Sequence, residues 1–201
     1  VGQCIGAGAL AAVGSAYTLM VFLISVLLGL AMGSGTVFSL HYGAGNHVAL
    51  RRSIFSSFVL IGIVTLILNV AVFIWLDPIL RLLQVPQDIY GMMRSYLWII
   101  FCGIVFTFIY NFYASLLRAV GDSVTPLWFL AVSVVLNIAL DLFFILQLDW
   151  GIQGAAAATV LAQGVAALGI IIYTYRRRPE LRWHHEDMCF DRTCLKEIAS
   201  F

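Results

Sequence analysis

Residues 116–163 read LLRAVGDSVTPLWFLAVSVVLNIALDLFFILQLDWGIQGAAAATVLAQ, and this stretch decides how the rest of the chain is interpreted. It holds two long apolar runs with a short polar turn between them. The first run has one ionisable side chain, Asp141. Asn137 and Ser133 precede it by one and two helical turns, so all three would share one helix face. Because an aspartate at membrane depth costs about 2.5–3.5 kcal/mol on insertion scales, we expect Asp141 to face protein or a water-filled cavity.

The composition of the whole chain indicates an integral membrane protein. Of its 201 residues, 62% are hydrophobic and only 10% are charged, and the mean hydropathy is +1.00. Soluble domains carry about 25% charged residues. The net charge is +1 and the basic residues fall in loops, so we expect no nucleic-acid partner. The chain begins without Met and ends inside an apparently amphipathic segment, and we interpret it as a fragment of a longer protein.

Five segments are long and apolar enough to cross a membrane as helices, which takes about 20 residues each. Transmembrane strands would need only about 9–11 alternating residues, so helices are favoured. We therefore predict an all-α membrane protein built as a bundle of five transmembrane helices. The expected spans are residues 9–42, 53–76, 89–117, 127–148 and 152–175, followed by a cytoplasmic linker at residues 176–201.

The distribution of charged residues predicts the orientation of these helices. The loops of one side hold most of the arginines, namely Arg51, Arg52, Arg118, Arg176, Arg177, Arg178 and Arg182. The loops of the other side hold fewer, together with several aspartates: Arg81, Arg94, Asp77, Asp88 and Asp149. The positive-inside rule places the first side in the cytoplasm of a multi-pass cell-membrane protein. On that side, Gly43 and Gly121 are expected to be left-handed residues that end helices.

The sequence gives little support to an enzyme or a metal site. No second carboxylate joins Asp141 in the apolar runs, and no Ser/His pair, Cys/His pair or H-E-x-x-H motif occurs. No glycine-rich loop follows a strand, so no nucleotide cofactor is expected. The spacing of His184, His185, Cys189 and Cys194 matches no standard zinc site. We expect no metal there, and the sequence leaves open whether this tail binds anything.

Polar side chains on neighbouring spans are candidate partners for Asp141. Thr159 and Gln163 lie one turn apart on an alanine-rich face, and Tyr96 lies toward the outer end of residues 89–117. We expect these three, with Asp141 and Asn137, to form an ion-coupling and substrate cavity. A carboxyl group there could bind and release a proton, or hold Na⁺ together with Asn137. The plainer interpretation is that such polar side chains only join neighbouring helices.

Several stretches resemble the multidrug and toxic compound extrusion (MATE) family. They are LLRAVGDSVTPLWFLAVSVVLNIALDLFFI, the following WGIQGAAAATVLAQ, and the earlier GLAMGSGTVFSLHYGAGN and DPILRLL. The resemblance covers essentially the whole chain. It implies twelve spans in two six-helix lobes, of which this chain would be the N-terminal lobe without its first helix. The linker would then lead to a C-terminal lobe. It also implies a cation site that matches Asn137, Asp141 and Thr159, with a tyrosine matched by Tyr96.

The function implied by this resemblance is an antiporter that uses H⁺ or Na⁺ to export organic cations, drugs or toxic compounds by alternating access. It would act as a monomer and need no cofactor besides the coupling ion. One alternative is a lipid-linked precursor flippase or polysaccharide exporter, which would be expected to line its cavity with basic residues. The predicted membrane core has Asp141 and no Lys or Arg, with Arg94 near its outer edge, which favours a cationic or neutral substrate. A second alternative is a non-transporting membrane scaffold, which would tolerate the loss of Asp141.

Overall fold

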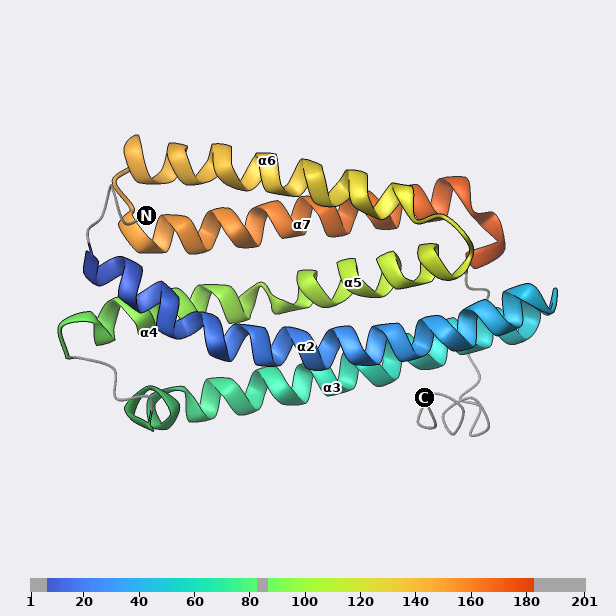
Figure 1. Ribbon diagram of the computed structural model, residues 1–201, viewed down its shortest axis with the longest axis horizontal. Helices are drawn as coiled ribbons and strands as arrows, with labels where there is room; N and C mark the ends of the chain where they lie inside the picture. The colour runs from blue at the N-terminus through green and yellow to red at the C-terminus, as the bar shows by residue number, and fades with distance from the viewer. Residues whose placement is uncertain (1–6, 83–86, 183–201) are drawn as a thin grey trace.

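A computed structural model of the chain describes residues 7–82 and 87–182, and these residues are almost entirely helical (Figure 1). No strand occurs among them. Five helical stretches are long and apolar enough to cross a membrane, so the predicted all-α bundle is confirmed. The elements in chain order are α2 (Ala7–Gly43), α3 (His47–Leu82), α4 (Gln87–Cys102), α5 (Ile104–Ala119), α6 (Val124–Leu146), α7 (Gly151–Arg177) and the short 3₁₀ turn η1 (Pro179–Leu181).

The helices lie side by side along the long axis of the molecule, with α6 at one edge and α3 at the other (Figure 1). α7 packs against α4, α5 and α6, and α2 packs against α3, α4 and α5. α6 makes nearly all of its helix contacts with α7. Its remaining faces are apolar and exposed, as Trp128 and Val135 show at 68% exposure each. Such a surface is suited to lipid or to a further membrane helix.

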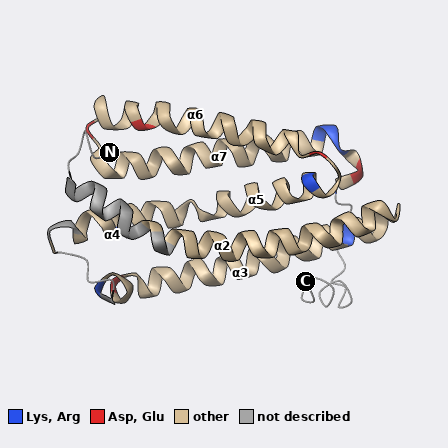
Figure 2. Ribbon diagram, viewed as in Figure 1, with Lys and Arg blue, Asp and Glu red and all other residues tan. Residues whose placement is uncertain are grey.

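Charged residues gather at the two ends of the bundle (Figure 2). We call the end that carries Arg51, Arg52, Arg118 and the C-terminus of α7 the basic end. The sequence predicts that this end is cytoplasmic. Asp141 is the one charged residue in the sequence of α6. In the structure, as in the sequence, Asp141 is thus separated from the charged ends of the bundle.

The third span differs from the single helix expected at residues 89–117. Two helices cover it, because α4 ends at Cys102 and α5 begins at Ile104, with Gly103 between them. The second span is longer than expected, since α3 continues from residue 76 through Pro78 to Leu82. Proline inside a helix removes a backbone hydrogen bond and bends it. The last part of α3 accordingly turns away from the helix axis in Figure 1.

The turns at the basic end support one of the two expected glycine caps. Gly121 has a φ of +89° and ends α5 as predicted. Gly43 is still helical, and the left-handed residue of that turn is Gly45, with a φ of +68°. The expectation for Gly43 was therefore wrong by two residues. The turn ends with Asn46, whose Oδ1 accepts a hydrogen bond from the N–H of Ala49 at 3.0 Å and caps α3.

Candidate functional site

A cavity of about 310 Å³ lies among four helices: α2, α5, α6 and α7. Six of its lining residues carry uncharged polar side chains at i, i+4 spacing on three helices. α5 gives one pair, α6 another and α7 the third, and each pair lies on one face of its helix. The three pairs are Thr107 with Asn111, Ser133 with Asn137, and Thr159 with Gln163. The remaining lining is apolar apart from Tyr110.

Hydrogen bonds join these pairs across the helices. Asn137 Nδ2 donates to Thr159 Oγ1 at 3.3 Å, which links α6 to α7. Thr107 Oγ1 donates to Gln163 Oε1 in a short bond that links α5 to α7. Asn111 Nδ2 donates to the carbonyl oxygen of Thr107 at 2.8 Å. The polar lining therefore contains two hydrogen-bonded groups: one holds Thr107, Asn111 and Gln163, and the other holds Asn137 and Thr159.

The small residues of α7 allow this close arrangement. Ala155, Ala158, Ala162 and Ala166 are all buried, at 6% exposure or less. A Cβ at Gly154 would meet Phe144 Cβ of α6 at 3.0 Å, so only glycine fits there comfortably. Short side chains let helix backbones approach closely in membranes. The alanine-rich run of the sequence thus brings Thr159 and Gln163 within reach of α5 and α6.

Asp141 and Tyr96 are not among the residues that line the cavity. Asp141 follows Asn137 by one turn of α6, toward the end opposite the basic end. Its Oδ1 is buried and has no hydrogen-bond partner among the described residues. Tyr96 of α4 is 7% exposed and lies within electrostatic range of Asp141. Of the five predicted site residues, the structure therefore brings Asn137, Thr159 and Gln163 into the cavity lining. Asp141 follows the lining residue Asn137 by one turn, and Tyr96 interacts electrostatically with Asp141.

Sequence reasoning did not assign Thr107 and Tyr110 to the site, although both line the cavity. Thr107 precedes Asn111 by one turn, so their spacing was a usable signal. Tyr110 donates its hydroxyl to the carbonyl oxygen of Pro126 at 2.8 Å, which only the tertiary structure reveals. Ser115, one turn after Asn111, lies outside the cavity. Its Oγ donates to the carbonyl oxygen of Ala31 at 2.7 Å and joins α5 to α2.

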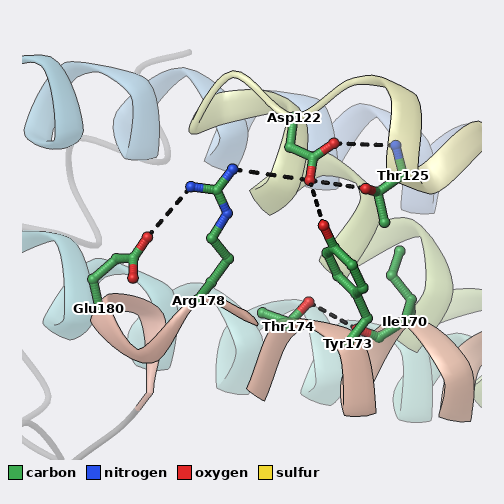
Figure 3. Close-up of polar contacts among 7 residues, drawn as sticks. All are labelled: Asp122, Thr125, Ile170, Tyr173, Thr174, Arg178 and Glu180. Carbon is green, nitrogen blue, oxygen red and sulfur yellow. Dashed lines mark hydrogen bonds and ion pairs between the residues drawn. The ribbon is translucent and has the colours of Figure 1, made fainter. Parts of the chain in front are cut away.

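A second polar cluster lies at the basic end, around Asp122 (Figure 3). Asp122 Oδ1 accepts a hydrogen bond from the backbone N–H of Thr125 at 3.1 Å, and Oδ2 accepts one from the Thr125 hydroxyl at 2.9 Å. The Tyr173 hydroxyl donates to Oδ2 at 3.3 Å. Arg178 Nη2 lies 3.9 Å from Oδ2, and its Nη1 lies 3.5 Å from Glu180. The cluster ties the α5–α6 turn to the end of α7 and to η1.

These contacts determine the charge state of Asp122. Partial burial raises the pKa of its carboxyl group, but the two hydrogen bonds from Thr125, the bond from Tyr173 and the positive charge of Arg178 lower it. The net result is a pKa below the ordinary value, because the contacts that favour the carboxylate outweigh its desolvation. Asp122 is therefore ionised at neutral pH, and its oxygens are occupied by the protein itself.

The opposite end has a smaller cluster that joins α3 to α4. Asp77 Oδ1 accepts hydrogen bonds from the Tyr90 hydroxyl at 2.8 Å and from Arg94 Nε at 2.9 Å. The side chains of Asp77 and Arg94 are about half exposed, at 46% and 50%. Exposed ion pairs contribute little to stability, because water screens the two charges. We interpret this cluster as a helix contact and not as a binding site.

Within the part of the chain that the structure describes, no group of three or more His, Cys, Asp or Glu side chains is arranged to hold a metal ion. Cys102 is a free, exposed thiol. The tail residues His184, His185, Cys189 and Cys194 lie outside the described residues, as does most of the expected linker. The described part of that linker continues α7 to Arg177 and then forms η1.

Comparison with known proteins identifies the family. The MatE family model matches residues 1–143. The chain belongs to the MATE family. It is 36% identical over 178 residues to the probable multidrug resistance protein YpnP of Bacillus subtilis (strain 168), covering 89% of this chain and 40% of that protein. It is 32% identical over 171 residues to the multidrug export protein MepA of Staphylococcus saprophyticus, covering 81% of this chain and 37% of that protein.

Solved structures show the same fold. A multidrug resistance MATE family transporter of the MOP superfamily, in an inward-facing conformation, aligns with a TM-score of 0.91 and 24% identity, covering 96% of this chain and 44% of that one. An outward-facing transporter of this description aligns with a TM-score of 0.90 and 25% identity, covering 96% and 43%. The chain thus spans about two fifths of the length of the proteins that it matches. It is a multi-pass membrane protein, and its relatives are named as transporters rather than enzymes.

Proposed function

We propose that this chain forms most of one lobe of a twelve-span exporter that uses H⁺ or Na⁺ to drive the efflux of organic cations, drugs or related toxic compounds. The proposal rests on two features that lie close together in the structure. One is a cavity of about 310 Å³ with polar side chains from α5, α6 and α7 in its lining. The other is Asp141, a membrane-level carboxylate with an unpartnered oxygen one turn from Asn137 of the cavity lining.

The lining favours substrates that are cationic or neutral and mostly apolar. It combines aliphatic side chains with hydroxyl and amide groups and with the ring of Tyr110, and it contains no Lys or Arg. Apolar walls with a few polar groups are typical of small-molecule sites. A flippase for phosphate-bearing lipid precursors would need cationic side chains at this position. The composition of the lining therefore weighs against that alternative.

The coupling step rests on Asp141. A buried carboxylate oxygen without a partner is unfavourable, and a bound proton or Na⁺ would remove that penalty. Asn137, one turn away, donates to Thr159 of the cavity lining. An ion that binds at Asp141 can therefore alter the contact between α6 and α7 at the cavity wall. If the ion has different affinities for the two facing states, its binding shifts their populations and expels the substrate.

The fold comparison supports a lobe that keeps its shape in both facing states. The chain aligns about equally well with the inward-facing transporter and with the outward-facing one, at TM-scores of 0.91 and 0.90. Alternating access in many transporters is a largely rigid movement of one bundle against another. The proposed second lobe would supply the opposing wall, and the basic end of α7 would lead toward it.

The test is efflux of a cationic dye from cells that express the complete transporter, comparing wild type with Asp141→Asn. The proton gradient and the Na⁺ gradient are collapsed in separate experiments. We expect the variant to reach the membrane and to lose efflux, and the gradient whose collapse stops the wild type identifies the coupling ion. Wild-type efflux by the variant would mean that Asp141 is structural and that the proposed coupling is wrong.

A further inference from the structure

The third membrane span is interrupted near its middle, between α4 and α5. The N–H of Gly103 donates to the carbonyl oxygens of Ile99 at 3.3 Å and Ile100 at 2.9 Å, and the N–H groups of Phe106 and Thr107 both return to the carbonyl oxygen of Gly103, at 3.0 and 3.4 Å. No proline lies at this break. Two neighbouring helices, α7 and α3, contact it.

One neighbour is α7, which approaches the break very closely. A Cβ at Gly103 would lie 2.9 Å from Cγ1 of Val160 and closer still to its Cγ2. Valine in a helix strongly prefers one side-chain rotamer, so Val160 cannot easily move aside. Gly103 has a φ of −82° and a ψ of −9°, which is a right-handed conformation that residues other than glycine also adopt. Glycine is therefore required here by the close approach of α7 and not by its backbone conformation.

The other neighbour is α3, which contributes Asn69. This side chain is 8% exposed, and its Nδ2 donates to the carbonyl oxygen of Phe101 at 2.8 Å, two residues before Gly103. Its Oδ1 is buried without a partner among the described residues. Thr65, one turn earlier on α3, is also buried but donates to Ile61 of its own helix at 2.7 Å. Asn69 thus binds the backbone of another helix at the break, whereas Thr65 binds only α3.

The break directly precedes the cavity residues of α5. Thr107 lies in the first turn of α5, where its hydroxyl donates to Gln163, and Asn111 lies one turn further. A small hollow connects the break to the cavity, since Ile100, Phe101 and Ile104 line it together with Thr107, Thr159 and Gln163. A shift of α5 at the break would therefore move Thr107 relative to Gln163.

We propose that Asn69 is a positioning residue for the cavity. By holding the carbonyl group of Phe101 at the break, it fixes where α5 begins and so presents Thr107 and Asn111 to the substrate. Asn69 does not line the cavity and acts through Thr107. The transport measurement below rests on the proposed exporter function, and the labelling measurement is independent of it.

The first measurement is the concentration dependence of dye efflux by the complete transporter. Asn69→Leu is compared with Thr65→Val, the matched control on the same helix. We expect Asn69→Leu to raise KM about tenfold, the factor that 1.4 kcal/mol of binding energy represents, with little change in kcat. Thr65→Val should stay near wild type, and Asn69→Gln, which keeps the amide donor, should restore part of the affinity. Equal effects of Asn69→Leu and Thr65→Val would overturn the proposal.

The second measurement follows the position of α5 without any transport. Thr107→Cys is introduced into a complete transporter whose native cysteines are replaced, and the rate of its reaction with a small thiol reagent is measured. We expect Asn69→Leu to change this rate severalfold and Thr65→Val to leave it unchanged. An unchanged rate in Asn69→Leu would overturn the proposal.

If Asn69→Leu does not reach the membrane, Asn69→Ala is measured in its place. A wild-type protein without dye efflux would count against the exporter function, while the labelling rate would still decide the role of Asn69.

Discussion

Asp122 and Asp141 occupy the same stretch of sequence and have opposite surroundings. The oxygens of Asp122, just before α6, accept hydrogen bonds from Thr125 and Tyr173 and face Arg178 (Figure 3). Asp141, well inside α6, has a buried Oδ1 that no described residue contacts by a hydrogen bond. Both oxygens of Asp122 thus have partners within the protein, whereas Asp141 has one oxygen that could still bind a proton or a cation. A satisfied carboxylate stabilises a fold, whereas an unsatisfied one at membrane depth is suited to an ion.

The largest contrast is expected in ion coupling. In the purified complete transporter, we expect Asp141→Asn to remove the effect of the coupling ion on dye affinity, an effect of about 5–150-fold in typical coupled systems. Asp122→Asn should keep that effect, because Asp122 has no free oxygen to offer to an ion. The measurement is the dye Kd at several proton or Na⁺ concentrations. Equal coupling in the two variants would remove the distinction between the two aspartates.

The second contrast is in stability. Asp122→Ala leaves the N–H and hydroxyl of Thr125 and the hydroxyl of Tyr173 without their acceptor, so we expect it to lower the free energy of unfolding by about 1–3 kcal/mol. Asp141→Asn should leave stability unchanged or raise it, because it removes the charge of a carboxylate whose Oδ1 is buried without a partner. Thermal unfolding of the two purified variants checks this. A larger loss of stability in Asp141→Asn than in Asp122→Ala would mean that Asp141, and not Asp122, is the structural aspartate.

The pH dependence of stability tests the same contacts. The pKa of Asp122 is lowered in the folded protein, so its contribution is fully present above the unfolded value of about 3.9. That contribution is lost as the pH falls from this value through the lowered folded pKa. We expect the difference in unfolding temperature between wild type and Asp122→Asn to shrink over this acidic range. A difference that stays constant on acidification would mean that the charge of Asp122 contributes nothing.

The two aspartates also show what a sequence alone can predict. Asp141 is visible as the one charged residue in an apolar run, and helix length and composition predict the bundle. The cluster around Asp122 depends on Tyr173 and Arg178, which are far along the chain and reach it only after α6 and α7 pack. The break at Gly103 was missed for the same reason. A glycine in an apolar run is compatible with a continuous helix until Val160 approaches it.

In the cavity lining, too, contacts between distant residues could not be predicted from the sequence. A substitution there is expected to have a smaller effect than those at the two aspartates. Spacing predicted that Thr159 and Gln163 share a face, but not that Gln163 would bond to Thr107 of α5. We expect Gln163→Leu to weaken dye binding about tenfold, because it removes one polar contact of the lining and leaves Thr107 unpaired. Ion coupling should persist, since Asp141 is untouched. Dye titration with and without the coupling ion separates the two effects, and a loss of coupling would extend the ion site into the cavity.

The smallest expected effect concerns one hydrogen bond of the Asp122 cluster. Tyr173→Phe removes the hydroxyl that donates to Oδ2 at 3.3 Å and keeps the ring, which packs edge-to-face against Phe129 with centroids 6.2 Å apart. Because Thr125 and Arg178 still serve the carboxylate, we expect a loss of about 0.5–1.5 kcal/mol in unfolding free energy and no change in dye efflux. Tyr110→Phe is the matched control in the cavity, where the lost hydroxyl belongs to the lining and dye affinity should change. If Tyr173→Phe altered efflux as strongly as Tyr110→Phe, the cluster at the basic end would take part in transport, and the separation between a structural and a functional aspartate would no longer hold.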